Sequence, residues 1–311
     1  MTDSRLQNVI QRLCQSAGVA NPSAVRDGEL LQRFVASADQ AAFELLVWRY
    51  QRLVLGVCRR VLRHSHEAED AFQATFLALA RKAGSISQRD SLGSWLYQVA
   101  YRIALKAGAQ RGQRALHERQ GLDLSAVAAA EAVAGDDLQP ALDRELSDLP
   151  EKYRAPVVLC YLEGKSYDEA ALQLGCPKGT VSTRLTYARE LLRKRLVRRG
   201  LALSTAALAS LGGTPSASAS VPTTLLSSTV GAAVLYASGK TALPGVAPGV
   251  VALADGAVRG LFLGQVQMFA AVLAAGLLCS GMAIVGYRAL GRGPAVAAAV
   301  SAPRGIAAPD V

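Results

Sequence analysis

The segment of residues 178–189 carries hydroxyl and cationic side chains at a spacing that suits contact with a nucleic acid. Hydroxyl groups can hydrogen-bond base edges in a DNA major groove, and Lys and Arg side chains bind phosphates. The hydroxyl groups belong to Ser182, Thr183, Thr186 and Tyr187, and the cations belong to Lys178, Arg184 and Arg189. The chemistry that this segment predicts is therefore noncovalent recognition of DNA.

Two helices joined by a tight turn are expected to position these side chains. Ser166 and Glu169 have the spacing of a capping box, which predicts a helix that begins at Tyr167. Gly175 ends that helix, and Pro177 suits the first turn of the next one. The second helix has an apolar stripe, which consists of Val181, Leu185, Ala188 and Leu192. The pattern predicts a helix-turn-helix, and the alternative is an ordinary helical hairpin with a solvated basic face.

Residues 27–111 predict a separate helical unit. A short helix begins near residue 27, and Ser37 and Gln40 have capping-box spacing ahead of a long apolar helix. A third helix is expected over residues 65–83 and a fourth over residues 94–111. No convincing alternation of apolar and polar residues marks a strand in this half of the chain, so the expected fold class is all-α.

The third helix of this unit has two faces of different character. Its inward face is expected to consist of Ala68, Phe72, Phe76 and Leu79. Glu69, Asp70 and Gln73 share the outer face near the start of the helix, where carboxylates suit the positive end of the helix dipole. By themselves, these three residues indicate a solvated, dipole-favoured first turn.

Composition and charge narrow the class of partner. The chain has 311 residues and a net charge of +10, and a basic excess favours polyanionic partners such as nucleic acid or an anionic membrane face. Residues 1–200 hold 29 Lys and Arg against 22 Asp and Glu, whereas residues 201–311 hold five against two. We find no paired carboxylates in a pocket pattern, no phosphate-binding Gly-rich loop and no metal cluster, so we expect neither an enzyme nor a cofactor.

The five cysteines are scattered and form no C-x-x-C motif, which favours free thiols in a reducing compartment. His64 and His66 flank Ser65 and point in different directions on a helix, so they make a poor metal pair and are expected to face solvent. The N-terminal residues contain no apolar core of signal-peptide length, which predicts that the N-terminal units stay in the cytoplasm.

The last third of the chain differs in composition from the rest. Residues 201–264 are rich in Ala, Ser, Thr, Gly and Pro and are interpreted as a tether. Residues 266–287 contain no charge and one Gln, and at 1.5 Å per residue they span roughly 33 Å, enough for a bilayer core. We predict a membrane helix there, and the alternative is a buried core helix.

With both helical units considered, the chain resembles an extracytoplasmic-function (ECF) sigma factor of the sigma-70 family. Residues 67–86 and 91–107 resemble regions 2.2 to 2.4, and residues 149–192 resemble region 4. The expected domains are an N-terminal lead (1–26), a region 2 unit (27–111), a linker (112–139), a region 4 unit (140–200), a tether (201–264), a membrane helix (265–288) and a tail (289–311). The resemblance implies binding to core RNA polymerase and to promoter DNA.

The resemblance also implies roles for individual residues. Core polymerase would bind Glu69, Asp70 and Gln73. The minus-10 element would be read by Ser87, Gln88, Arg89, Gln98, Arg102 and Lys106, above an anchor of Trp95, Leu96, Val99 and Ile103. The minus-35 element would be read by Ser182, Thr183, Thr186 and Tyr187, with Lys178, Arg184 and Arg189 on phosphates. The chain departs from many relatives, which place Arg at base-reading positions and an acidic residue where Ala74 stands.

Further partners and an alternative function follow from the C-terminal third. Some members of this family carry a membrane-spanning extension, which would hold the factor at the inner membrane and mask it, as a separate anti-sigma regulator does elsewhere. Such a regulator is a further expected partner, although no zinc-binding anti-sigma motif is present. The alternative function is a membrane-tethered helix-turn-helix regulator that does not engage polymerase, which leaves the pattern of residues 67–107 unexplained.

Overall fold

The computed structural model describes residues 25–62, 64–86, 91–119, 138–201, 221–240 and 243–260. All regular structure in these ranges is helical, as the apolar periodicity predicts. Three expected minus-10 residues, Ser87, Gln88 and Arg89, lie outside the described residues. So do residues 266–287, the predicted membrane helix, and within the described ranges no helix is long and apolar enough to cross a membrane.

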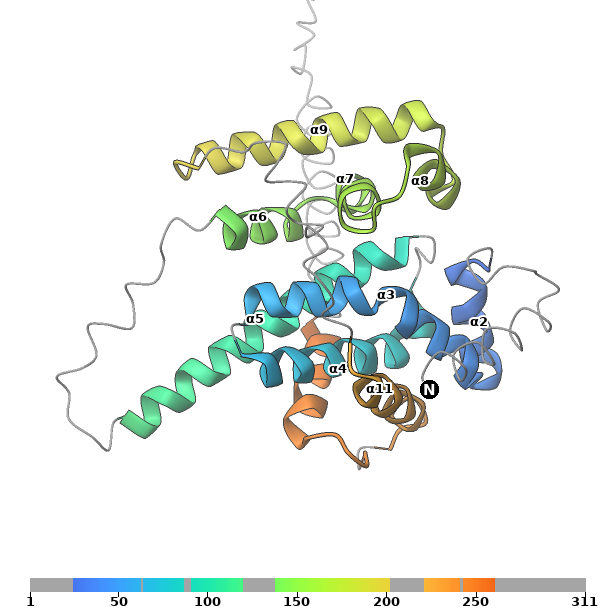
Figure 1. The fold of residues 1–311 in the computed structure, drawn as a ribbon, viewed down its shortest axis with the longest axis vertical. Helices are drawn as coiled ribbons and strands as arrows, with labels where there is room; N and C mark the ends of the chain where they lie inside the picture. Colours follow the sequence, from blue (N-terminus) through green and yellow to red (C-terminus); the bar gives the residue numbers. More distant parts are fainter. Residues whose placement is uncertain are drawn as a thin grey trace, which may run out of the picture. The chain divides into compact units, whose positions relative to one another are not determined.

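The region 2 unit is built from four helices and a short 3-10 turn (Figure 1). They are α2 (Asp27–Ser37), α3 (Gln40–Val61), α4 (Ser65–Lys82), the 3-10 turn η2 (Ala83–Ser85) and α5 (Leu92–Arg119). The helices α3, α4 and α5 pack against one another. The expected inward residues of α4 are fully buried, namely Ala68, Phe72, Phe76 and Leu79.

The start of α3 differs from the predicted capping box, which was wrong. The N-cap of α3 is Asp39, whose Oδ1 accepts hydrogen bonds from the backbone N–H groups of Ala41 and Ala42 at 3.0 and 3.2 Å. Ser37 instead belongs to α2, and its hydroxyl donates to the carbonyl of Arg33 at 2.8 Å. The physical reason is the left-handed Ala38 (φ 53°), which ends α2 and leaves Asp39 as the residue at the start of α3.

The region 4 unit contains four helices and a π-helical turn (Figure 1). They are α6 (Leu138–Ser147), α7 (Glu151–Val157), the π-helical turn η5 (Val158–Leu162), α8 (Tyr167–Leu174) and α9 (Lys178–Val197). The helices α6, α7 and α8 all pack against α9. Glu145 of α6 pairs with Arg195 at 3.3 Å and with Arg199 at 2.7 Å, which joins the two ends of the unit.

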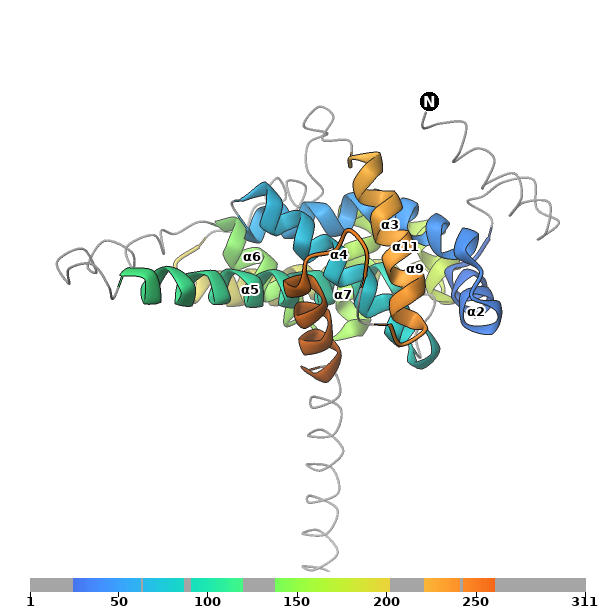
Figure 2. The same cartoon turned by 90° about the horizontal axis from the view of Figure 1, so that it is seen from below.

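Part of the expected tether is folded. Helix α11 (Thr223–Ala237) lies against α4 and also contacts α3, and residues 248–260 form a further helical segment (Figures 1 and 2). The buried residues of α11 are Leu225, Thr229, Val230, Ala232, Ala233 and Tyr236. This set recurs every three or four residues, which is a core-facing stripe. Its small and hydroxylated side chains resemble linker composition, and for that reason the sequence did not predict a packed helix.

Candidate nucleic-acid interface

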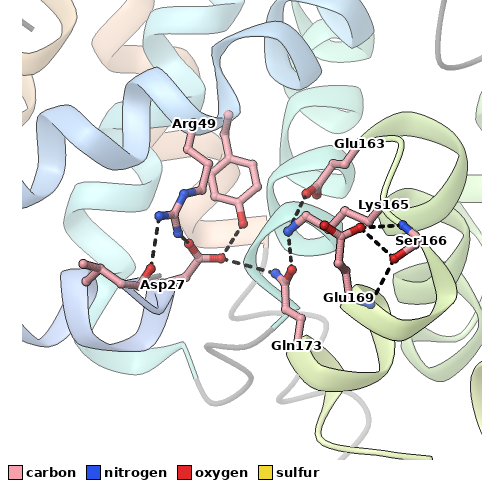
Figure 3. Close-up of polar contacts among 9 residues, drawn as sticks. Asp27, Arg49, Glu163, Lys165, Ser166, Glu169 and Gln173 are labelled. Atoms are coloured by element: carbon pink, nitrogen blue, oxygen red, sulfur yellow. Dashed lines mark hydrogen bonds and ion pairs between the residues drawn. The ribbon is translucent and has the colours of Figure 1, made fainter. Parts of the chain in front are cut away.

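The structure confirms the predicted helix-turn-helix. The backbone N–H of Glu169 donates to the hydroxyl of Ser166 at 3.3 Å, and the Ser166 N–H donates to the Glu169 carboxylate at 2.8 Å (Figure 3). The backbone bond and then the hydroxyl bond from Ser166 lower the pKa of Glu169. Gly175 ends α8 in the left-handed conformation (φ 60°), and Pro177 occupies the N-cap of α9, one position before the expected first turn.

The second helix, α9, has the two faces that the sequence predicts. Its apolar stripe of Val181, Leu185, Ala188 and Leu192 is fully buried at 0% exposure. The five expected contact residues that are exposed are Lys178, Ser182, Thr183, Thr186 and Tyr187. The other two, Arg184 and Arg189, are half-buried and lie at opposite edges of the exposed face, since successive residues are 100° apart. The structure therefore leaves all seven residues outside the buried stripe of α9.

Hydrogen bonds on this face orient the two threonine hydroxyl groups. Thr183 donates to the carbonyl of Gly179 at 2.9 Å, and Thr186 donates to the carbonyl of Ser182 at 3.1 Å. A hydroxyl that donates to its own helix presents its oxygen outward as an acceptor. The Thr186 oxygen also accepts a 3.4 Å bond from Arg189. In this arrangement Thr183 suits an amino group of adenine or cytosine on the major-groove edge, and Thr186 can accept such a bond with its remaining lone pair.

The expected minus-10 residues of α5 are not equivalent in the structure. Arg102 and Lys106 are exposed, whereas Gln98 is half-buried and contacts the region 4 unit. The Gln98 side chain donates to the carbonyl of Ser147 at 3.4 Å and accepts a bond from Arg154 at 3.2 Å. The anchor residues Leu96, Val99 and Ile103 are buried, and Trp95 is half-buried.

The three expected polymerase-binding residues differ in burial, and one of them, Gln73, contacts α11. Glu69 and Asp70 are half-buried, and burial raises the pKa of Asp70. Gln73 is only 7% exposed, because its amide donates to the hydroxyl of Ser228 in α11 at 3.1 Å. The sequence placed Gln73 on an outer face, and in the structure α11 covers this residue.

Arg154, which no sequence motif singles out, lies 4% exposed between the two units. Its guanidinium donates to Ser94 at 3.1 Å, to the carbonyls of Ser147 and Leu149 at 3.0 and 2.9 Å, and to Gln98. It also pairs with Glu151 of its own helix. An Arg that follows a Pro-capped helix start has no local sequence pattern that predicts such contacts. Its role at the junction of the two units is therefore visible only from its partners in the structure.

A second polar network joins α2 and α3 to α8 (Figure 3). Asp27 pairs with Arg49, accepts a hydrogen bond from Tyr50, and accepts a 3.5 Å bond from Gln173 of α8. Lys165 donates to Gln173 and pairs with Glu163 at 3.4 Å. Burial raises the pKa of Glu163 to about 7, against the opposing effect of the Lys165 ammonium group.

None of the described cysteines and histidines is among the expected DNA-contact residues. Cys58, Cys160 and Cys176 are free thiols, and burial raises the pKa of Cys58 to about 12. His64 and His66 are exposed, as expected. Cys14 and Cys279 lie outside the described residues.

Comparisons with known proteins match both helical units. The family model of Sigma-70 region 2 matches residues 46–114, and that of Sigma-70, region 4 matches residues 140–192. The RNA polymerase sigma-H factor of Pseudomonas aeruginosa is 30% identical over 182 residues, which cover 55% of this chain and 94% of that protein. The ECF RNA polymerase sigma factor SigM of Mycobacterium tuberculosis is 33% identical over 184 residues, covering 59% of this chain and 91% of that protein.

The ECF RNA polymerase sigma factor SigW of Bacillus subtilis is 30% identical over 173 residues, which cover 52% of this chain and 92% of that protein. Among solved structures, the sigma factor RpoE of Bartonella quintana in complex with the anti-sigma factor NepR is 26% identical, covering 50% of this chain and 94% of that one, with a TM-score of 0.23. The curated relatives are matched over nearly their whole length. The chain therefore belongs to the ECF sigma factors of the sigma-70 family, the non-enzymatic subunits that direct RNA polymerase to promoters.

Proposed function

We propose that three surfaces of this sigma factor divide the work of transcription initiation. Helix α9 reads the minus-35 element, α5 with residues 87–89 reads the minus-10 element, and the outer face of α4 binds core polymerase. The observation that carries this proposal is the exposed face of α9, where hydroxyl groups and cations stand opposite a fully buried apolar stripe. A helix that is anchored on one side and polar on the other is what docking in a major groove requires.

Each surface has chemistry that suits its role. On α9, Lys178, Arg184 and Arg189 would position the helix on phosphates while the hydroxyl groups contact base edges. On α5, Arg102 and Lys106 would hold the DNA backbone beside a base that has left the stack. On α4, Glu69 and Asp70 would meet cationic side chains of polymerase.

Run-off transcription with core RNA polymerase tests the proposal. The full-length chain should direct initiation from selected sequences in a promoter library, and replacing Thr183 and Thr186 by Ala should change the selected minus-35 sequence without changing polymerase binding. Ser227→Ala on the exposed side of α11 serves as the matched control. A chain that binds duplex DNA but neither copurifies with core polymerase nor opens a promoter would instead be a helix-turn-helix regulator.

We also propose that residues 266–287 anchor the factor in the membrane. The support is their uncharged, apolar sequence of 22 residues. Replacing Leu277 and Leu278 by Arg places two charges near the middle of the span, each costing about 3 kcal/mol on insertion. The variant should move from the membrane fraction to the supernatant, whereas a Leu277→Val and Leu278→Val variant should stay. Equal fractionation of both variants contradicts the anchor.

A further inference from the structure

The middle of helix α4 is buried around its whole circumference. Every residue from position 71 to position 80 is buried, including the polar Gln73 and Thr75. Phe72 and Phe76 face the core of the region 2 unit, and on a helix of 100° per residue Ala74 and Leu77 lie on the opposite side. Both of these residues are nevertheless 0% exposed. Since α11 packs mainly against α4, with a smaller contact to α3, we infer that the C-terminal extension covers the outer face of α4 (Figures 1 and 2).

Specific polar contacts accompany this packing. The Gln73 amide donates to the hydroxyl of Ser228 at 3.1 Å, and the Arg81 guanidinium donates to the carbonyl of Tyr236 at 3.2 Å. The same guanidinium lies over the ring of Tyr236, 5.2 Å from its centroid. The hydroxyl of Tyr236 donates in turn to Asp255, which ties α11 to the helical segment 248–260. Gln73 and Arg81 of α4 therefore both have partners in the extension.

The extension also reaches the helix that is expected to contact the minus-10 element. The ammonium end of Lys106 in α5 lies against Gly256, at the place where a Cβ would stand. A single folded segment, residues 221–240 with 243–260, thus contacts α4 and α5 together. These contacts involve one expected polymerase residue, Gln73, and one expected minus-10 residue, Lys106.

The contact is exclusive. The Gln73 amide is bonded to Ser228, and a second helix cannot lie on Ala74 and Leu77 while α11 is there. Helix α11 contains no charged residue, so it suits the uncharged part of the outer face of α4. Glu69 and Asp70, at the start of α4, remain half-buried. This acidic edge is where a cationic partner can make first contact before α11 leaves.

We propose that residues 221–240 and 243–260 occupy the polymerase-docking face of α4 within the same chain, and that core RNA polymerase binds only after α11 leaves it. The inference rests on the proposed role of α4 in polymerase binding. Where the competent state is a small fraction of the population, the apparent affinity falls by that fraction. Loosening α11 should therefore tighten polymerase binding without any change in the docking residues.

The experiment compares full-length variants for binding to purified core RNA polymerase. Val230→Asp and Ala233→Asp each bury a charge against α4 or α3, at positions that are 2% and 0% exposed. Ser227→Asp introduces the same charge on the exposed side of the same helix and is the matched control. With α11 docked in about nine molecules of ten, each buried variant should bind polymerase about tenfold more tightly than the wild type, and the control should not differ from it.

Hydrogen exchange of the wild-type complex supplies a second, independent readout. Addition of core polymerase should speed exchange in residues 223–237 while the amides of α4 stay protected. The inference is overturned if the wild type binds as tightly as both buried variants, or if α11 stays protected in the complex. If neither the wild type nor any variant binds core polymerase, the proposed function itself fails, which is a different result.

Discussion

Arg60 and Asp143 form a bidentate ion pair between two helices, although the two residues are 83 positions apart in the chain. The Arg60 Nε donates to Asp143 Oδ2 at 2.9 Å, and Nη2 donates to Oδ1 at 3.1 Å. The hydroxyl of Tyr97 adds a third bond to Asp143 at 2.7 Å. Burial alone would lower the pKa of Arg60, but the Asp143 carboxylate beside it raises the pKa. The pair joins α3 of the region 2 unit to α6 of the region 4 unit.

Removing one member of this pair should destabilise the chain strongly. In an Arg60→Met variant the Asp143 carboxylate, 1% exposed, is left without its counter-ion, which costs about 3 kcal/mol. Urea unfolding followed by circular dichroism measures the change. Arg59→Met, at an exposed neighbouring position, is the control and should be near neutral. The double variant Arg60→Met with Asp143→Leu should recover part of the loss; equal stability of all variants would show that the pair contributes nothing.

The capping box of α8 should contribute to the stability of the helix-turn-helix. Ser166→Ala removes the oxygen that accepts from the Glu169 N–H, and loss of such a cap costs about 1 kcal/mol. Native-state hydrogen exchange in α8 measures the local free energy of opening. Ser227→Ala, which removes an exposed hydroxyl outside this unit, should leave exchange in α8 unchanged. Unaltered α8 protection in Ser166→Ala would contradict the role of the cap.

Glu163 should make stability depend on pH. Its pKa in the folded chain is about 7, above the ordinary 4.5, because burial disfavours the charged carboxylate. Between these two values the folded state holds a proton that the unfolded state has released, so stability falls as pH rises through this window. We expect Glu163→Gln to match the wild type near pH 4, below the ordinary pKa, and to exceed its stability at pH 8, by about 3 kcal/mol at most.

Thermal unfolding of both proteins across this pH range measures the difference. Glu190→Gln, on the surface of α9, is the control for a lost carboxylate. The groups around Glu163 that also carry charge are Lys165, Asp27 and Arg49, which are the same in both proteins. Parallel stability curves for the wild type and Glu163→Gln would show that Glu163 keeps an ordinary pKa.

Phosphate contacts by α9 should appear in the salt dependence of DNA binding. Lys178 is exposed and pairs with the exposed Asp168 at 2.8 Å, so it can exchange this partner for a phosphate. Lys178→Ala should weaken binding to all minus-35 sequences alike and reduce the slope of log K against log salt by about 0.9. Lys240→Ala, the same loss of charge outside α9, should leave the slope unchanged. A change in sequence preference with an unchanged slope would mean that Lys178 contacts a base.

The helix-turn-helix could be predicted from the sequence because its signals are local. The Ser166 and Glu169 side chains bond within one turn, and Gly175 adopts its left-handed conformation at the helix end. The buried stripe of α9 follows directly from helical periodicity. The predicted cap of α3 was Ser37, whereas the cap in the structure is Asp39, because the left-handed conformation of Ala38 ends α2 after Ser37.

The long-range contacts carried no such signal. Nothing near Arg60 in the chain indicates Asp143, and nothing near Gln73 indicates Ser228, since these pairs are separated by 83 and 155 residues. Hydrophobic periodicity and helix capping depend on residues that are close together in the sequence. They therefore predict the helices and their buried faces from the sequence alone. Which face meets which helix depends on how the whole chain packs. This packing covers Gln73 with α11 and brings Gln98 within hydrogen-bond distance of Arg154.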